Sequence, residues 1–373
     1  MRFFLYGYYG QGNLGDDLLL RACVLGIRGI RPDARFVVRA GRAPTGLETL
    51  SIPYEIAQID EVLSDQTRSR ISRLLAVLVT YRGYLRDCDW FVFGGGTLFH
   101  ERTSAQPIIM LALICLMARA MGVRIAALGV GVAELKSPAA LAALRGIVFL
   151  SDIFAVRDTA ALKQCRKAGA SRRVTVTCDL AFALDGADKV RASRRSGVAG
   201  GVVGISVYPP ALEGSETARH TFGALRGAVS QLVGLGCTVR LLAFHDDEVA
   251  LMRLADDLAD ARPSVERLAD TPSLAAVFAE LDLMCGMRFH GLVLAAVHGV
   301  PFVGIAADNK IEAVCQLFDM PVLPAVGLRA SATVEAVAAS LFRSPDRGVT
   351  DRCVAEANRN FLLLSDAVGP RGA

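Results

Sequence analysis

One stretch, residues 281–305, constrains the fold of this chain more than any other: LDLMCGMRFHGLVLAAVHGVPFVGI. The apolar run 281–285 predicts a buried strand, and the small apolar residues 292–297 predict a helix. Arg288 and His290 lie where the strand passes into the helix. Because open α/β sheets bind ligands at the carboxyl ends of their strands, both residues are candidates for binding an anion. The alternative is that they are ordinary polar residues at a helix N-terminus.

The N-terminus has a similar arrangement of strand, loop and helix. Residues 2–6 predict a strand, and the loop GYYGQGNLGDD leads into a helix whose N-cap we expect at Asp16. The loop is neither a GxGxxG fingerprint nor a Walker P-loop. Glycines let the backbone approach a ligand closely, so Gly12, Asn13 and Asp16 are candidate binding residues. A tight turn that only packs is the alternative.

Polar residues follow three more predicted strands. The run DWFVFGGGTLFHE ends a buried strand with three glycines, and Gly95 and Gly96 could turn backbone N–H groups toward a ligand. His100 follows in the same loop, while Arg157 and Asp179 end two later strands. All five are candidate site residues. The alternatives are a loop histidine without chemistry and an arginine that only pairs with a neighbouring aspartate.

Strand-like and helix-like segments alternate along the chain, which predicts mostly parallel sheets with helices on both faces. Residues 186–201 interrupt this alternation with a composition rich in Gly, Ser and charge, typical of a domain boundary. We therefore expect two doubly wound, Rossmann-like α/β domains facing across a cleft. The expected parts are an N-terminal domain (1–187), a linker (188–200), a C-terminal domain (201–345) and a helical tail (346–373).

The composition argues against several classes of protein. With 53% hydrophobic residues the chain can fill two cores, and a formal charge of +4 does not favour nucleic-acid binding. The nine cysteines lack CxxC or His/Cys ligand spacing, so we expect buried, reduced thiols in a cytoplasmic protein and no metal site. We expect neither a signal peptide nor a transmembrane helix.

The segment from Arg68 to Arg86, RSRISRLLAVLVTYRGYLR, is a helix candidate with five arginines around an apolar centre. One interpretation is an ordinary amphipathic helix that packs on a sheet and leaves its arginines in solvent. The other is a docking surface for an anionic membrane or a lipid-linked substrate. This second interpretation would place the protein at the inner face of the membrane.

Together these motifs resemble the polysaccharide pyruvyl transferase family. The shared stretches are GYYGQGNLGDD, FGGGTLFHE, LGVGV, the VRD at Val156, CDLAF at Cys178, AFHDD at Phe244, and MRFHGLVLAAVHGVPFVGI followed by ADNKI. Their order and approximate spacing agree from about Phe4 to Phe318. Two departures are Asp17, where members often carry Glu, and Met287, where members often carry Ser.

The resemblance implies a GT-B-like fold and transfer of the enolpyruvyl group of phosphoenolpyruvate to a sugar, which forms a pyruvate ketal and releases phosphate. The acceptor would be a glycan, such as an exopolysaccharide, or a lipid-linked oligosaccharide, and it is expected on the N-terminal domain. By the same resemblance, Arg288, His290, Arg157 and His100 contact the donor.

The chemistry of this reaction needs these residue types. Phosphoenolpyruvate carries a phosphate and a carboxylate, which arginines bind through paired N–H groups. His290 is the candidate general acid that protonates the methylene carbon. The base for the sugar hydroxyl could be His100, Asp179 or Asp16, and Lys310 is a further candidate cation. No step requires a metal or another cofactor.

Two alternatives remain open from the sequence. The first is a GT-B glycosyltransferase that uses a nucleotide sugar, although the second domain shows no clear Glu-rich ribose-binding segment. The second is a non-catalytic member that binds a sugar or an anion. The joint presence of Arg157, Arg288, His290 and Lys310 argues against this second alternative.

Overall fold

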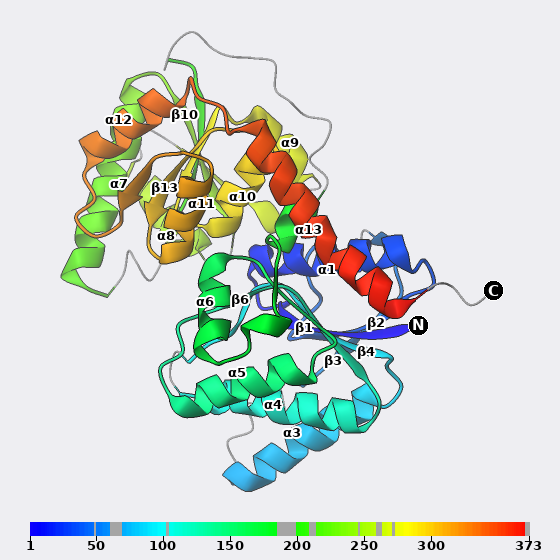
Figure 1. The fold of residues 1–373 in the computed structure, drawn as a ribbon. Coiled ribbons are helices and arrows are strands. Elements are labelled where there is room, and N and C mark those ends of the chain that lie inside the picture. Colours follow the sequence, from blue (N-terminus) through cyan, green and yellow to red (C-terminus); the bar gives the residue numbers. More distant parts are fainter. Residues whose placement is uncertain are drawn as a thin grey trace. The chain divides into compact units, whose positions relative to one another are not determined.

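The computed structural model describes residues 1–47, 50–59, 69–101, 104–184, 199–208, 214–244, 247–258, 263–270 and 273–369. The chain forms two compact units (Figure 1). Unit 1 comprises Met1–Leu184 and Cys353–Ala373, and unit 2 comprises Asp185–Arg352. Apart from positions 199 and 200, the linker predicted at 188–200 lies outside the described residues. None of the described helices combines the length and the hydropathy needed to cross a bilayer.

Unit 1 is built from short apolar strands that alternate with helices. Its strands are β1 (Arg2–Tyr9), β2 (Arg35–Ala40), β3 (Tyr54–Ala57), β4 (Trp90–Gly94), β5 (Thr97–Phe99), β6 (Arg124–Val132), β7 (Ile153–Val156) and β8 (Thr175–Val176). Its helices are α1 (Leu14–Ile30), α3 (Arg70–Leu85), α4 (Gln106–Ala120), α5 (Pro138–Leu150) and α6 (Thr159–Lys167).

The strands of unit 1 pair in parallel in the order β3-β2-β1-β4-β6-β7-β8, and β5 pairs with β6. The chain order reverses between β1 and β4. At such a switch point the helices that follow the two strands cover opposite faces, which opens a crevice at the strands' carboxyl ends. The loops after β1 and β4 therefore lie where a doubly wound sheet binds its ligand.

Two helical layers cover the sheet of unit 1. In Figure 1, α3, α4 and α5 lie below the sheet and α1 lies above it. On the lower side, Phe4, Phe91 and Phe93 of the sheet share one core with Tyr81 of α3 and Ile114 of α4. Burying each such side chain contributes about 1.5–3 kcal/mol of transfer free energy, so this core anchors both helices.

Unit 2 repeats the same organisation. Its strands are β9 (Val202–Ser206), β10 (Thr238–Ala243), β11 (Ser264–Arg267), β12 (Leu283–Gly286), β13 (Phe302–Ala306) and β14 (Val322–Pro324). Its helices are α7 (Glu216–Gly234), α8 (Glu248–Asp256), α9 (Leu274–Glu280), α10 (Phe289–Val297), α11 (Asn309–Leu317) and α12 (Ala330–Ser340). The parallel order β11-β10-β9-β12-β13-β14 places the switch point between β9 and β12.

The predicted fold class is confirmed, because each unit is a parallel α/β sheet of Rossmann-like topology. The sequence predicts strands at 2–6, 35–39, 90–93, 124–130, 153–156, 174–178, 202–207, 238–244, 265–268, 281–285 and 302–305, so the observed strands β3, β5 and β14 have no predicted counterpart. Each has only three or four residues, and none has a fully buried run that would mark it. The N-cap predicted at Asp16 is wrong: α1 begins at Leu14, and the Asn13 side chain accepts a hydrogen bond from the Gly15 N–H at 3.3 Å.

The last helix, α13 (Arg347–Val368), returns the chain to unit 1. There the Thr177 hydroxyl lies 3.1 Å from the Asn360 side-chain oxygen, and Phe361 packs against Gly26 of α1. A Cβ at Gly26 would come within 2.3 Å of the Phe361 ring. The close approach of α13 to α1 therefore requires glycine at this position.

We predict opposite effects for alanine at two glycines of α1. Gly29→Ala should raise the free energy of unfolding by about 0.5–1 kcal/mol, because its Cβ meets no atom within 4 Å. Gly26→Ala should lower it by about 1–3 kcal/mol, because the Phe361 ring must move. Urea unfolding followed by circular dichroism measures both changes. Equal effects would contradict the packing of α13 on α1.

Candidate functional site

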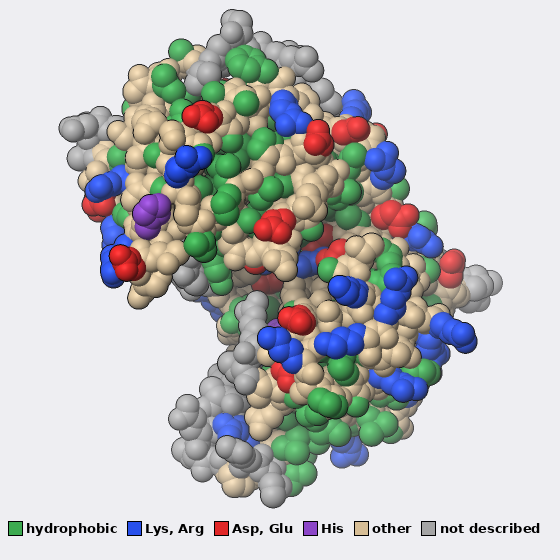
Figure 2. Space-filling view, turned by 60° about the vertical axis from the view of Figure 1, so that its left-hand side comes forward, with side chains coloured by type: hydrophobic (Ala, Val, Ile, Leu, Met, Phe, Trp, Pro, Cys, Tyr) green, Lys and Arg blue, Asp and Glu red, His purple; other side chains and the backbone are tan. Residues whose placement is uncertain are grey.

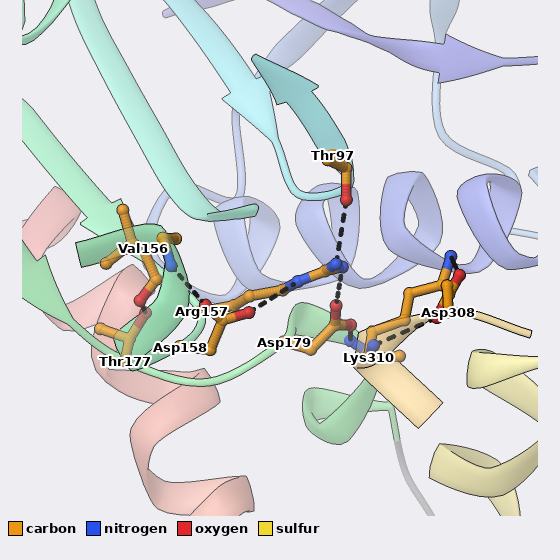
Figure 3. Close-up of polar contacts among 10 residues, drawn as sticks. Thr97, Val156, Arg157, Asp158, Thr177, Asp179, Asp308 and Lys310 are labelled. Atoms are coloured by element: carbon orange, nitrogen blue, oxygen red, sulfur yellow. Dashed lines mark hydrogen bonds and ion pairs between the residues drawn. The ribbon is translucent and has the colours of Figure 1, made fainter. Parts of the chain in front are cut away.

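The candidate site of unit 1 is centred on Arg157, directly after β7. Its Nη1 lies 2.9 Å from Asp179 Oδ2, its Nη2 donates to Thr97 Oγ1 at 3.0 Å, and its Nε lies 3.5 Å from Asp158 Oδ2 (Figure 3). The Arg157 side chain is 8% exposed and that of Asp179 is 3% exposed. The ion pair with Asp158 agrees with one sequence interpretation, but the buried partner of Arg157 is Asp179.

Local packing and charge fix the Arg157 guanidinium. A Cβ at Gly131 of β6 would come within 3.0 Å of its Nη2, so the side chain lies directly against the backbone of β6. Burial alone would lower the pKa of Arg157, but the charges of Asp179 and Asp158 outweigh burial and raise this pKa above its ordinary value. Arg157 is therefore a permanent cation in a fixed orientation.

A buried carboxylate shapes the glycine-rich loop after β1. Asp17 accepts hydrogen bonds from the backbone N–H groups of Gly10, at 2.8 Å, and Thr45, at 2.9 Å. Burial raises the pKa of Asp17, and these two hydrogen bonds partly offset the rise. Gly10 and Gly12 adopt φ angles of +62° and +79°, which favour glycine. This role of Asp17 was not predicted from the sequence.

Three predicted binding residues, Asn13, Asp16 and Gly96, come together at the start of α1. The Asn13 Nδ2 donates to Asp16 Oδ2, and a Cβ at Gly96 would lie 3.3 Å from Asp16 Oδ1. Gly95 and Gly96 both have positive φ angles, +78° and +75°. The charge of Asp16 also acts on Arg157. The structure thus brings the loops after β1 and β4 together with the Arg157 cluster.

His100 lies directly after β5, three residues beyond Thr97. Its side chain is partly exposed, with a buried Nδ1. The following residue, Glu101, accepts hydrogen bonds from the N–H groups of Lys136 and Ser137, both at 2.9 Å. The loop that carries His100 is therefore tied to the start of α5.

The candidate site of unit 2 is centred on Arg288, the N-cap residue of α10. Its Nε lies 3.0 Å from Asp247 Oδ2, and its guanidinium carbon lies 5.3 Å from the centroid of the Tyr208 ring. The Asp247 side chain is 0% exposed and that of Arg288 is 16% exposed. A buried carboxylate and an aromatic face thus hold Arg288 at the switch point between β9 and β12.

His290 lies in the first turn of α10, two residues after Arg288. Its Nε2 is buried, and its ring packs edge-on against Phe289 with 5.2 Å between the ring centroids. Just before α10, a Cβ at Gly286 would come within 2.2 Å of Ser206 Oγ. The end of β12 can approach β9 this closely only with glycine there.

Lys310 is the second residue of α11, the helix that follows β13, and β13 is the neighbour of β12. Its Nζ lies 3.1 Å from Asp308 Oδ2 (Figure 3), and both side chains are substantially exposed. Arg288 pairs with Asp247, so these two cations belong to different ion pairs. In the part of the chain that the structure describes, no group of three or more His, Cys, Asp or Glu side chains could hold a metal ion.

Sequence reasoning gave no role to Thr97, Tyr208 or Asp247. All three follow the carboxyl end of a strand or the glycine loop after it. This position in the sequence could have marked them as candidate site residues. The pairing itself was not visible, because 41 residues separate Asp247 from its arginine. The neighbours of Asp247 in the AFHDD stretch, His245 and Asp246, lie outside the described residues.

We predict unequal costs for removing the two charges that face Arg157. Asp179→Asn should lower the free energy of unfolding by about 3–5 kcal/mol, because the buried guanidinium loses its buried partner. Asp158→Asn should cost less than about 1 kcal/mol, because Asp158 is 41% exposed. Asparagine can retain the backbone hydrogen bonds from Ala181 and Ala161. If chemical denaturation gave equal costs, the buried pair would not be the dominant one.

The structure is similar to several solved structures of the GT-B type. HepE from Anabaena, in complex with UDP, is 16% identical over 98% of this chain and 97% of that one, with a TM-score of 0.56. The UDP-GlcNAc 2-epimerase of Methanocaldococcus jannaschii is 10% identical over 98% and 100%, with a TM-score of 0.66. MurG from Acinetobacter baumannii is 13% identical over 98% of each chain, with a TM-score of 0.52. At these identities the likeness shows the fold alone.

No curated protein matches the chain. The sequence model of one family, polysaccharide pyruvyl transferase, matches residues 13–309. This match extends from the loop after β1 to the start of α11, so it includes the carboxyl ends that carry both arginine clusters. The chain therefore belongs to the polysaccharide pyruvyl transferase family.

Proposed function

We propose that this protein transfers the enolpyruvyl group of phosphoenolpyruvate to a sugar of a polysaccharide or of its lipid-linked precursor. The product is a pyruvate ketal, and phosphate is released. The observation that carries the proposal is the position of the RFH motif, because Arg288 and His290 stand at the switch point of unit 2 in a member of this family. A guanidinium, an imidazole and a helix N-terminus together suit a small anion.

Donor binding is assigned to Arg288 and to Arg157. Phosphoenolpyruvate presents phosphate and carboxylate oxygens, which the N–H groups of arginine match in geometry. A buried carboxylate already holds each guanidinium, so little side-chain freedom is lost when an anion binds. The exposed Lys310 is assigned as a further cation for the donor.

His290 is assigned as the general acid. It gives a proton to the methylene carbon, which leaves a cationic centre at C2, and a sugar hydroxyl adds there as a base takes its proton. The C2–O bond to phosphate then breaks, and phosphate leaves with the bonding electrons. A second hydroxyl adds at C2 and loses its proton, closing the ketal. One hydroxyl proton restores His290, and the other leaves with phosphate.

The base for the sugar hydroxyl is assigned to Asp16 or His100 rather than Asp179. Asp179 accepts from Arg157 through Oδ2 and from the Ala181 N–H through Oδ1, which supports a positioning role. Asp16 instead faces the glycine loop after β4. The glycines of both loops, Gly12, Gly95 and Gly96, are assigned to backbone contacts with substrate.

A GT-B glycosyltransferase that uses a nucleotide sugar is the alternative function. One observation favours it: HepE, which shares the fold, was solved in complex with UDP. The two proposals differ in their first ligand, so binding separates them without knowledge of the acceptor.

We predict that phosphoenolpyruvate, and not UDP, stabilises the protein in a thermal-shift titration. A ligand that binds only the folded state adds about 2.7 kcal/mol at one hundred times its Kd. Arg288→Ala should abolish this stabilisation. The matched control is Arg226→Ala, which removes a half-exposed arginine of α7 in the same unit and should leave the shift unchanged. Stabilisation by UDP but not by phosphoenolpyruvate would contradict the proposal and support the glycosyltransferase alternative.

We predict that His290→Ala lowers the rate of phosphate release by about 10²–10⁴-fold, the usual contribution of a general acid. The probes are p-nitrophenyl glycosides of galactose, mannose, glucose and N-acetylglucosamine, each supplied with phosphoenolpyruvate. Because Arg288 remains, the thermal shift with phosphoenolpyruvate should persist. His220→Ala, at an exposed histidine of α7, is the control. If a folded His290→Ala protein released phosphate at the wild-type rate, His290 would not be the general acid.

A further inference from the structure

Helix α4 exposes an apolar stripe to solvent. Residues 107–117, PIIMLALICLM, contain no charged, amide or hydroxyl side chain. One side of the helix is buried on the sheet, while Ile109, Leu113, Leu116 and Ala120 are exposed at the three- and four-residue spacing of a helix face. A helix that is apolar on all sides is normally buried on all sides. The outer side of α4 is exposed to solvent but carries apolar residues, so we expect another surface to cover it.

The neighbouring helices extend this surface. Helix α3 exposes Leu75 and Val79, at 57% and 69%, and α5 exposes Phe149 at 48%. We define the α3–α5 face as the exposed side chains of Leu75, Val79, Ile109, Leu113, Leu116 and Phe149. Figure 2 shows hydrophobic side chains gathered over the lower part of unit 1, with basic side chains beside them.

The charged residues within the three helices have one sign. Helix α3 contains three arginines, α4 and α5 one each, and none of the three contains aspartate or glutamate. The whole chain is nearly balanced, with 41 basic and 37 acidic residues. Arg82 and Arg145 are exposed and form no ion pair with a described carboxylate, whereas Arg119 lies 3.0 Å from Asp152.

We propose that the α3–α5 face docks on an anionic phospholipid surface. The exposed leucines, valine and isoleucine would enter the boundary between headgroups and acyl chains, and the arginines would meet lipid phosphates. Phe149 suits the headgroup level, because Arg145 and Arg173 lie over its ring at 5.6 and 5.4 Å.

A second copy of the chain fits this face less well than a lipid surface. A two-fold contact would place the same patch against itself and so bring arginines toward arginines. In the sequence, a membrane contact was one of two interpretations of residues 68–86 alone, and α4 and α5 supply the larger apolar part of the face. Arg68 and the side chains of residues 70 and 71 lie outside the described residues. The proposal does not rest on the proposed function, because it uses no residue of either candidate site.

Co-sedimentation of the full chain with vesicles tests the apolar part of the proposal. The protein should bind vesicles of phosphatidylcholine with phosphatidylglycerol and should not bind phosphatidylcholine alone, and high salt should weaken the binding. Leu75→Gln/Leu116→Gln should reduce binding by roughly tenfold or more. Leu235→Gln/Leu317→Gln, which changes two leucines of similar exposure in unit 2, should leave it unchanged.

The charge variant Arg82→Glu/Arg145→Glu should also reduce binding by roughly tenfold or more, and Arg226→Glu/Arg343→Glu in unit 2 is its control. Unchanged melting temperatures show that the variants are folded. The proposal is overturned if the wild-type protein does not bind anionic vesicles or if the α3–α5 variants bind them as tightly as the wild type does. Self-association that Leu75→Gln/Leu116→Gln abolishes, without vesicle binding, would assign the face to a second copy instead.

Discussion

In each unit, one buried carboxylate holds an arginine at the carboxyl end of a strand. Asp179 holds Arg157 in unit 1, and Asp247 holds Arg288 in unit 2. A free arginine side chain carries about 2 kcal/mol of rotamer entropy, much of which it would lose on binding a ligand. Because these two side chains are already ordered in the folded protein, ligand binding costs less side-chain conformational entropy.

Glycines on central strands make room for these arrangements. Gly131 lets Arg157 lie against β6, and Gly286 lets β12 approach Ser206 of β9. Gly286 and Ser206 are also register partners in the parallel sheet. A Cβ added at Gly131 would collide with the Thr97 hydroxyl and the Arg157 guanidinium, and one added at Gly286 would collide with Ser206.

Local patterns were enough to predict most of the strands and the residues that follow them, including Arg157 and Arg288, but not the short strands β3, β5 and β14. They could not show which carboxylate meets which arginine, because the partners are 22 and 41 residues apart and meet only through the strand order. The N-cap of α1 was misassigned for a local reason: the run NLGDD offers three side chains that can cap a helix, and the backbone placed Asn13 in that position.

Charge compensation explains how two largely buried arginines can be held at strand ends. A buried ion costs several kcal/mol unless it is paired, and the aspartates supply that pairing. The same pairing weakens the electrostatic attraction between the arginines and an anion, because the aspartates balance much of the arginine charge. In unit 1, Asp16 adds a further negative charge. Attraction must then come from N–H groups in fixed directions and from the N-terminus of α10. Lysine would replace arginine poorly in such a site, because its three N–H donors rotate on a flexible stem and lack the planar, rigid fork of five N–H groups.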